Sequence, residues 1–103
     1  MRSLIKLKIL EGRNADFEAA FVKAGMLSRP KALDPAFEGE LLRTVDDPST
    51  YYVVAQWSSA DAYAKWQATS ADGADEAAMA VLAKLLVDPI PGKILDVVAT
   101  SRD

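Results

Sequence analysis

The amino-terminal residues alternate between apolar and polar side chains. Ile5, Leu7 and Ile9 would lie on one side of an extended chain, with two lysines between them on the other side. An alternation with a period of two is typical of a strand that buries one face. The sequence therefore predicts a strand over residues 4–10.

A helix is expected after a short turn. Asn14 is suited to cap its first turn, and Phe17 and Phe21 recur with neighbouring alanines at helical spacing. This pattern predicts an amphipathic helix over residues 14–27. Residues 28–35 contain two prolines and two basic residues, and they are predicted to form a surface loop.

The middle of the chain has the pattern of a β-hairpin. Apolar residues alternate loosely over residues 37–45, and residues 51–57 are dense in aromatic and β-branched side chains. Residues 46–50 lie between these runs and read Asp-Asp-Pro-Ser-Thr, which is typical of a turn. We expect two antiparallel strands joined at this turn.

The remaining third predicts more helix and a last strand. Residues 60–69 are rich in alanine and predict a second helix. Residues 74–87 place apolar side chains on one stripe, which predicts a further helix or a continuation of the second. Prolines and a glycine within residues 88–92 end the helical region, and residues 93–100 are β-rich and predict the final strand.

This order, β-α-β-β-α-β, indicates a ferredoxin-like α+β fold in a single domain over residues 1–103. Such a fold has a four-stranded antiparallel sheet with helices on one face only. The other face needs a cover, and two such sheets can close into a shared, dimeric α+β barrel. We therefore predict a symmetric homodimer with Val54 near its centre. Other residues expected on this face are Lys6, Lys8, Tyr52, Gln56 and Asp96.

Composition and charge narrow the functional classes. The 103 residues are 50% hydrophobic and carry a net charge of −3, so the basic footprint of a nucleic-acid-binding protein is absent. The chain has no Cys and no His, which excludes thiol nucleophiles and Ser-His triads and removes the commonest metal ligand. We expect no metal site, no bound nucleic acid and no membrane partner. The sequence is interpreted as that of a cytoplasmic protein.

Trp57, Tyr63 and Trp66 are the most unusual local feature, because three large aromatics fall within ten residues. One interpretation is that they wall a flat cavity and orient a planar aromatic ligand with their N–H and O–H groups. The alternative is that they only pack in the core, as large aromatics at the junction of a strand and a helix commonly do. Spacing alone does not decide between the two.

Arg43 is in register with Phe37 and should therefore face the helices. It could hold a phenolate or an enolate in an apolar pocket, where water is excluded and charge stabilisation is strong, or it could extend its charge to solvent at the edge of the sheet. Residues expected to line the substrate pocket are Phe17, Phe21, Phe37, Val53, Trp66 and Met79.

In residues 52–66 a strand that ends in a Trp is followed by a helix start with Ser, Asp and further aromatics. The stretch reads Tyr-Val-Val-Ala-Gln-Trp-Ser-Ser-Ala-Asp-Ala-Tyr-Ala-Lys-Trp. It resembles the signature of the antibiotic biosynthesis monooxygenase (ABM) family. The resemblance implies a ferredoxin-like fold that dimerises through its sheets, with one pocket per subunit between sheet and helices.

The resemblance also implies a chemistry. Members of the family that need no cofactor oxidise polycyclic phenols or quinols, and their strand-ending Trp and helix Tyr match Trp57 and Tyr63. We therefore expect a cofactor-independent monooxygenase that oxidises a quinol or a polycyclic phenolic substrate with dioxygen. Trp57, Tyr63 and Arg43 are its expected catalytic residues, without a flavin or a metal. The haem-degrading branch of the family has an iron-binding His where this chain has Glu76.

Two other functions remain open on the same fold. The chain could be a small-molecule-binding or regulatory dimer without enzymatic activity, because a fold alone does not imply an activity. It could also be a cyclase or an isomerase, which would need a polar pocket and no oxygen. Whether the cavity is open, or is filled by Phe17, Phe21 and Phe37, separates binding from packing alone.

Overall fold

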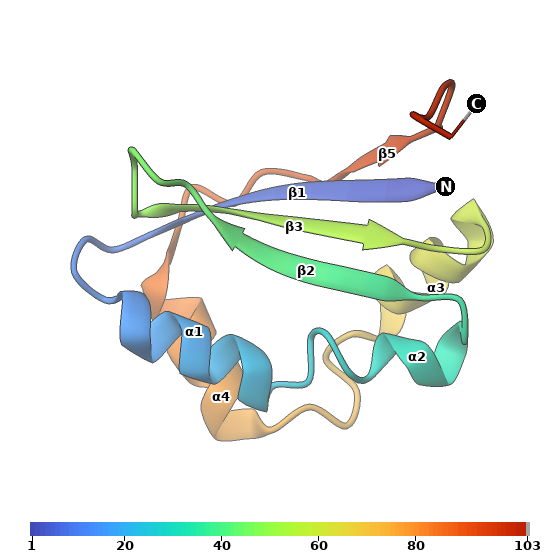
Figure 1. The fold of residues 1–103 in the computed structure, drawn as a ribbon. Helices are drawn as coiled ribbons and strands as arrows, with labels where there is room; N and C mark the ends of the chain where they lie inside the picture. Colours follow the sequence, from blue (N-terminus) through green and yellow to red (C-terminus); the bar gives the residue numbers. More distant parts are fainter. Residues whose placement is uncertain (103) are drawn as a thin grey trace.

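The sheet is built on a long central strand at the amino terminus. The computed structural model describes residues 1–102, and its central strands are antiparallel neighbours in the order β2-β3-β1 (Figure 1). Their bounds are Arg2–Ile9 for β1, Glu38–Arg43 for β2 and Thr50–Gln56 for β3. Ile5 lies opposite Val53, and Val53 lies opposite Leu41, so these apolar side chains share one face.

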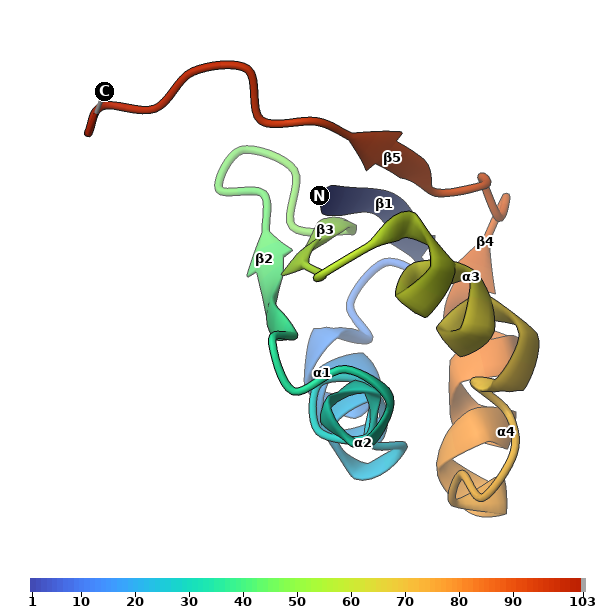
Figure 2. The same ribbon diagram turned by 90° about the vertical axis from the view of Figure 1, so that its right-hand side faces the viewer.

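The helices lie on one side of this sheet (Figures 1 and 2). Helices α1 and α4 pack against each other beneath one end of the strands, and α2 contacts α3 at the other end. The helices comprise α1 Asn14–Lys23, α2 Pro30–Leu33, α3 Ala60–Thr69 and α4 Glu76–Leu85. The ferredoxin-like α+β arrangement predicted from the sequence is confirmed.

Short strands cover the outer edge of β1. Strand β4, Leu86–Val87, pairs with β1 at Lys8 and Ile9, and strand β5, Lys93–Leu95, pairs with β1 from Arg2 to Leu4. The segment between them crosses from one end of β1 to the other. Both strands therefore protect the edge that β1 would otherwise expose.

Some predicted boundaries were wrong, each for an identifiable reason. The first helix ends at Lys23, not at residue 27, because the chain turns at Gly25 with a positive φ of 76°. The predicted surface loop 28–35 contains α2, in which Pro30 is buried at the first helical position. The predicted helix 74–87 and the final strand 93–100 are both shorter, since pairing with β1 begins at Leu86 and ends at Leu95.

The core contains two hydrophobic clusters, one under each end of the sheet. The first joins Phe17 and Phe21 of α1 to Tyr51 of β3 and to the buried face of α4. The second is aromatic and contains Phe37, Ala55, Trp57, Tyr63 and Trp66. No helix within residues 1–102 has the length and apolar character that crossing a bilayer requires.

Asp34 ties the two loops at the end of the sheet together. Its buried carboxylate accepts hydrogen bonds from the backbone N–H of Ser58, at 2.7 Å, and of Ala36, at 3.0 Å. The bond from Ser58 is the main reason that the pKa of Asp34 lies below its ordinary value of 3.8, although burial opposes this shift. The carboxylate form therefore stabilises the fold.

Asp34→Asn is expected to lower stability at neutral pH, since an amide replaces an acceptor that holds two backbone N–H groups. Because the folded pKa of Asp34 is lowered, its contribution is complete above the unfolded pKa and is lost as the pH falls below about 4. Urea unfolding across this range should show that the stability gap between wild type and variant narrows in acid. A gap that is constant at every pH would contradict this account.

Candidate functional site

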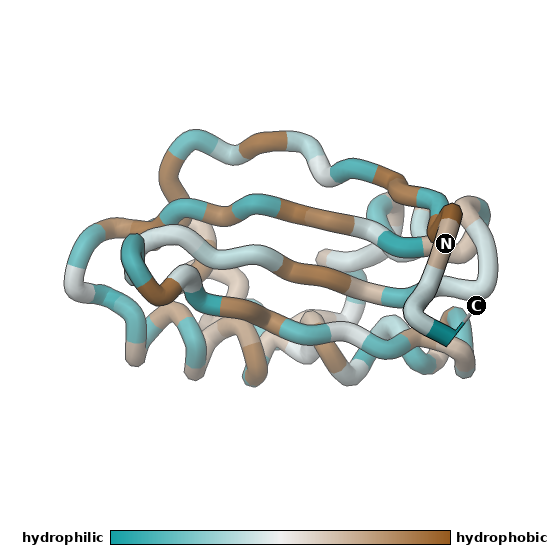
Figure 3. Tube along the Cα trace, turned by 45° about the horizontal axis from the view of Figure 1, so that its top comes forward, coloured by the Kyte–Doolittle hydropathy of each residue, from teal (hydrophilic) through white to brown (hydrophobic). Residues whose placement is uncertain are grey.

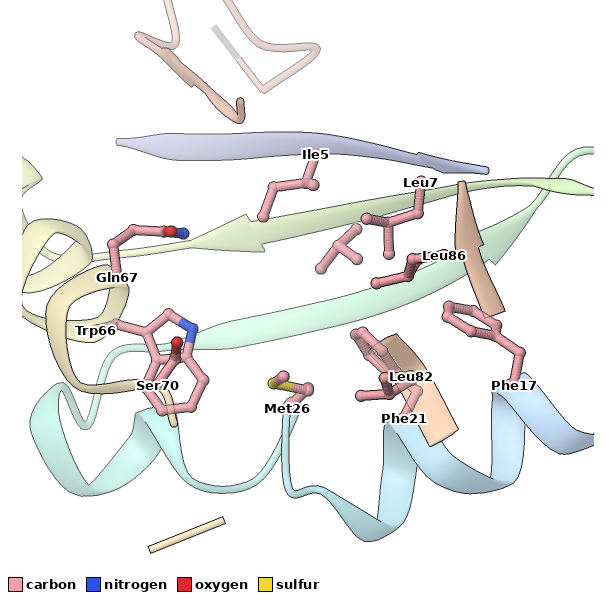
Figure 4. Close-up of a pocket in the computed structure, with 11 residues that line it drawn as sticks. Ile5, Leu7, Phe17, Phe21, Met26, Trp66, Gln67, Ser70, Leu82 and Leu86 are labelled. Atoms are coloured by element: carbon pink, nitrogen blue, oxygen red, sulfur yellow. The ribbon is translucent and has the colours of Figure 1, made fainter. Parts of the chain in front are cut away.

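A cavity of about 190 Å3 lies between the sheet and the helices. Figure 4 shows its roof on β1, with Ile5 and Leu7, and its floor on α1 and the loop that follows, with Phe21 and Met26. The full lining is Ile5, Leu7, Phe17, Phe21, Met26, Val53, Trp66, Gln67, Ser70, Leu82 and Leu86. The cavity is therefore open, and the aromatics of α1 form part of its wall without filling it.

Polar groups are confined to one end of this cavity. Gln67 and Ser70 lie beside Trp66 on and just after α3, whereas Phe17 lies at the opposite end (Figure 4). Among residues 1–102, no charged side chain lines the cavity. Such a site can orient a ligand through neutral hydrogen bonds, but it offers no ionic partner.

The periodicity of α3 brings the polar residues to the cavity. Tyr63, Trp66, Gln67 and Ser70 follow the spacing i, i+3, i+4 and i+7, which places them on one helical face. Sequence analysis identified the two aromatics and missed Gln67 and Ser70. The same spacing could have found them, because it continues the stripe that the aromatics begin.

Trp66 is held in place from its outer side. The guanidinium carbon of Arg29 lies 4.9 Å from the centroid of the Trp66 ring. Arg29 also donates hydrogen bonds to the backbone carbonyls of Ala24, Ser70 and Asp72, at 2.9, 2.5 and 3.1 Å. A cation over an indole face is attracted to it, and the three carbonyls fix that cation. Arg29 therefore holds the cavity wall formed by Trp66 and Ser70.

Trp57, Phe37 and Tyr63 form a packed aromatic group next to the cavity but do not line it. The Trp57 ring centroid lies 4.8 Å from that of Phe37 and 5.5 Å from that of Tyr63, both in edge-to-face geometry. The Trp57 indole N–H donates to the hydroxyl of buried Ser3 at 2.9 Å. Its donor is therefore used within the protein and is not directed into the cavity.

Arg43 faces the helices, as its register in the strand predicts, but it lies beyond the end of the cavity. Its guanidinium donates to the Glu18 carboxylate at 2.9 Å, and just over half of its side chain is exposed. Glu18 also accepts from the buried Tyr51 hydroxyl. Arg43 is thus neutralised by a partner on α1. Met79 of α4 packs against the first cluster, also outside the cavity.

The predicted site residues therefore divide into two groups. Those that line the cavity are Phe17, Phe21, Val53 and Trp66, and those that lie outside it are Phe37, Arg43, Trp57, Tyr63 and Met79. The hydrophobic pattern identifies the wall residues because they belong to the face under the helices. The position of a residue along that face depends on tertiary packing.

The segment before β5 packs closely against Tyr63 and against Ile5 of the cavity wall. A Cβ at Gly92 would lie 2.5 Å from the Tyr63 hydroxyl oxygen and 2.9 Å from Cγ1 of Ile5, which lines the cavity. Burial raises the pKa of Tyr63, and the neighbouring Gln67 side chain partly opposes this shift. The Tyr63 phenol therefore remains protonated at neutral pH.

A known family model covers most of the chain. The model of the antibiotic biosynthesis monooxygenase family matches residues 1–78, a span that runs from β1 into α4 and includes all of α3. The chain belongs to this family. A comparison with proteins of curated function finds no match.

Several solved structures share this fold. The chain resembles SnoaB, a cofactor-independent oxygenase from Streptomyces nogalater, with 20% identity, a TM-score of 0.69 and coverage of 99% of this chain and 96% of that one. It also resembles tetracenomycin F2 cyclase from Streptomyces glaucescens, a type-II polyketide cyclase, with 14% identity, a TM-score of 0.66 and coverage of 98% of both chains. At these identities the likeness concerns the fold.

Gly92→Ala tests the close contact at the cavity wall. The added methyl group should clash with the Tyr63 hydroxyl and with Ile5, and overpacking of this kind costs about 1–3 kcal/mol. Tyr63→Phe removes the oxygen that the new Cβ would meet. In thermal unfolding, the double variant should therefore lose less stability than the sum of the two single variants. Simple additivity would show that the two positions do not touch.

Proposed function

We propose that the chain is a cofactor-independent monooxygenase that oxidises a phenolic or quinol substrate with dioxygen in the cavity beside α3. The observation that carries this proposal is an apolar cavity with hydrogen-bonding groups only at one end, in a chain of the ABM family. An apolar, partly enclosed site removes water from a bound phenol and can separate its reactive intermediates from solvent. SnoaB, with the same fold, is a cofactor-independent oxygenase.

The proposed reaction balances without an added reductant. A phenol with a free ortho or para position and one dioxygen give a quinone and one water, and a quinol and one dioxygen give a hydroxyquinone and one water. In both cases the substrate supplies all the electrons, one oxygen atom enters the product, and the other leaves as water. The protein is required to bind the ring, exclude water and stabilise charge on the ring oxygen.

Different residues would bind the ring, position the cavity wall and stabilise the fold around it. Trp66, Gln67 and Ser70 supply neutral hydrogen-bonding groups at the polar end of the cavity, and Val53 forms part of its wall. Trp57 and Tyr63, which match the family signature, pack in one cluster with Trp66 and act as positioning residues. Arg43 stabilises the attachment of α1 through its ion pair with Glu18.

Ligand binding without turnover is the second candidate function. The absence of a charged side chain from the cavity lining within residues 1–102 favours it, because no general base is placed there. The same observation disfavours a cyclase that relies on acid–base catalysis. Oxygen uptake separates the candidates, since binding and cyclisation consume none.

Val53→Phe should fill the cavity from the strand side and reduce oxygen uptake with a reactive phenol or quinol by more than about tenfold. Ser70→Phe blocks the polar end and should have the same effect without overpacking the sheet. Val22→Phe, on an exposed position of α1, is the matched control and should retain wild-type uptake. Circular dichroism checks folding. If wild type does not exceed buffer with any phenol or quinol, the proposed function is refuted.

We further propose that the chain works as a symmetric homodimer formed through the uncovered side of the sheet. Figure 3 brings this side forward and shows apolar and polar residues in alternation along its strands. Leu4, Tyr52 and Val54 are half-buried there, and Leu42 is 44% exposed. An apolar strip of this kind is commonly covered by a partner, and a second copy of the chain is the simplest one.

The charges on this side favour one orientation of the second copy. Glu40, Val54, Leu4 and Lys93 form one row across β2, β3, β1 and β5. A two-fold axis parallel to the strands would place Glu40 opposite Lys93 of the partner subunit, and Val54 opposite Leu4 of the partner subunit. A two-fold axis perpendicular to the strands, in the plane of the interface, would instead place the acidic strand β2 of one subunit over β2 of the other. Electrostatic complementarity therefore favours the first arrangement.

Val54→Glu should abolish this dimer, because it buries two unpaired carboxylates close to the axis. Light scattering of wild type should give about twice the 11.1 kDa mass of one chain, and the variant should be monomeric or aggregated. Glu40→Lys should weaken the dimer, and adding Lys93→Glu should restore it by reversing the pair. A wild-type monomer at micromolar concentration, or no restoration by the charge reversal, would contradict the arrangement.

A further inference from the structure

The Trp66 indole N–H makes no hydrogen bond to another residue in the described part of the chain, and it is not among the buried side-chain atoms that lack a partner, so it stays accessible. Trp66 is only 9% exposed, and the hydrogen bonds within residues 1–102 include none from its ring nitrogen. Figure 4 shows this nitrogen on the side of the ring that faces the cavity. The N–H is therefore available to an acceptor on a ligand that occupies the cavity.

Two further polar groups lie at the same end. The Gln67 amide can donate or accept a hydrogen bond, and the Ser70 hydroxyl can do both. Arg29 fixes this end by stacking on Trp66 and by binding the Ser70 carbonyl. The three groups suit one hydroxyl group of a ligand. Its oxygen can accept a hydrogen bond from the indole N–H, and its O–H can donate one to the Gln67 carbonyl or to the Ser70 hydroxyl.

The opposite end of the cavity has no polar partner to offer. It is formed by Phe17, Leu82 and Leu86. A second hydroxyl group on the ligand would lose water there and gain no hydrogen bond, which costs about 1–3 kcal/mol. A charged group would be disfavoured much more strongly. The ligand should therefore be neutral and apolar at this end.

Size limits the ligand as well. The cavity measures about 190 Å3. An apolar cavity of about 150 Å3 holds benzene, whereas sites for drug-sized ligands span about 300–1,000 Å3. The enclosed space thus suits one aromatic ring with a short substituent, and three fused rings would extend beyond it.

We infer that the cavity selects a neutral, single-ring phenol with a short apolar substituent, bound with its hydroxyl against Trp66, Gln67 and Ser70. This inference rests on the proposed function where it calls the ligand a substrate, but the binding preference is independent of turnover. It makes Trp66 and Ser70 specificity-determining residues. It also narrows the substrate from quinols and polycyclic phenols to one ring with one polar end.

Isothermal titration calorimetry with four ligands tests each part of the inference. The reference is 4-ethylphenol, ethylbenzene lacks the hydroxyl, 4-hydroxybenzyl alcohol places a second hydroxyl at the apolar end, and anthrone has three rings. We expect 4-ethylphenol to bind most tightly, with each of the others weaker by about threefold or more. Tighter binding of anthrone, or equal binding of ethylbenzene, would overturn the inference.

Two variants separate recognition of the hydroxyl from general stability. Trp66→Phe keeps an aromatic ring and removes the N–H, and Ser70→Ala removes a hydroxyl with little change in volume. Each variant should bind 4-ethylphenol about three- to tenfold more weakly than wild type and should bind ethylbenzene with unchanged affinity. Thr69→Ala is the matched control, because the exposed Thr69 hydroxyl donates to the Lys65 carbonyl and does not line the cavity. Equal losses for both ligands would contradict hydroxyl recognition.

Oxygen uptake measured in parallel keeps this inference distinct from the proposed function. If 4-ethylphenol binds as expected and no phenol or quinol supports oxygen uptake, the selectivity stands and the monooxygenase proposal fails. If larger quinols support uptake and 4-ethylphenol does not bind, the monooxygenase proposal stands and the selectivity fails.

Discussion

The packing of all described helices on one side of the sheet is the constraint on which the rest of the structure depends. It divides every strand into a side that faces the helices and a side that does not. The first side carries Ile5 and Val53, which line the cavity. The second carries Val54 and Leu4, which the helices do not cover and which form the centre of the proposed dimer interface. The candidate site and the proposed interface thus alternate along the same strands.

Two aromatic clusters leave the cavity between them. Phe17 and Tyr51, with ring centroids 4.7 Å apart, fill the space under one end of the sheet, and Phe37 and Trp57 fill the other. Met26 and Trp66 border the gap, and Arg29 fixes the Trp66 ring from outside. The cavity is therefore bounded by rigid groups on several elements, which is the arrangement that selective ligand binding needs.

The sequence predicts well which face of a strand or helix a residue occupies. It predicts less well which other residues that side chain contacts. Period-two alternation correctly assigned Ile5, Val53 and Arg43 to the helix side of the sheet. It did not show that Arg43 would meet Glu18, 25 residues away in sequence, because such pairs depend on how helices dock. For the same reason α2 was missed, since Pro30 is buried only by the fold. Gln67 and Ser70 become binding groups only once α3 is placed.

Within residues 1–102 the Trp66 indole N–H is free to bind a ligand, whereas the Trp57 indole N–H is bonded to Ser3. The chain contains only these two tryptophans, so a 1H–15N spectrum should show two indole N–H signals. On titration with a single-ring phenol, the Trp66 signal should move strongly, and the Trp57 signal, bonded to Ser3, should change little. Movement of the Trp57 signal alone, or no movement of either at saturating ligand, would contradict the account.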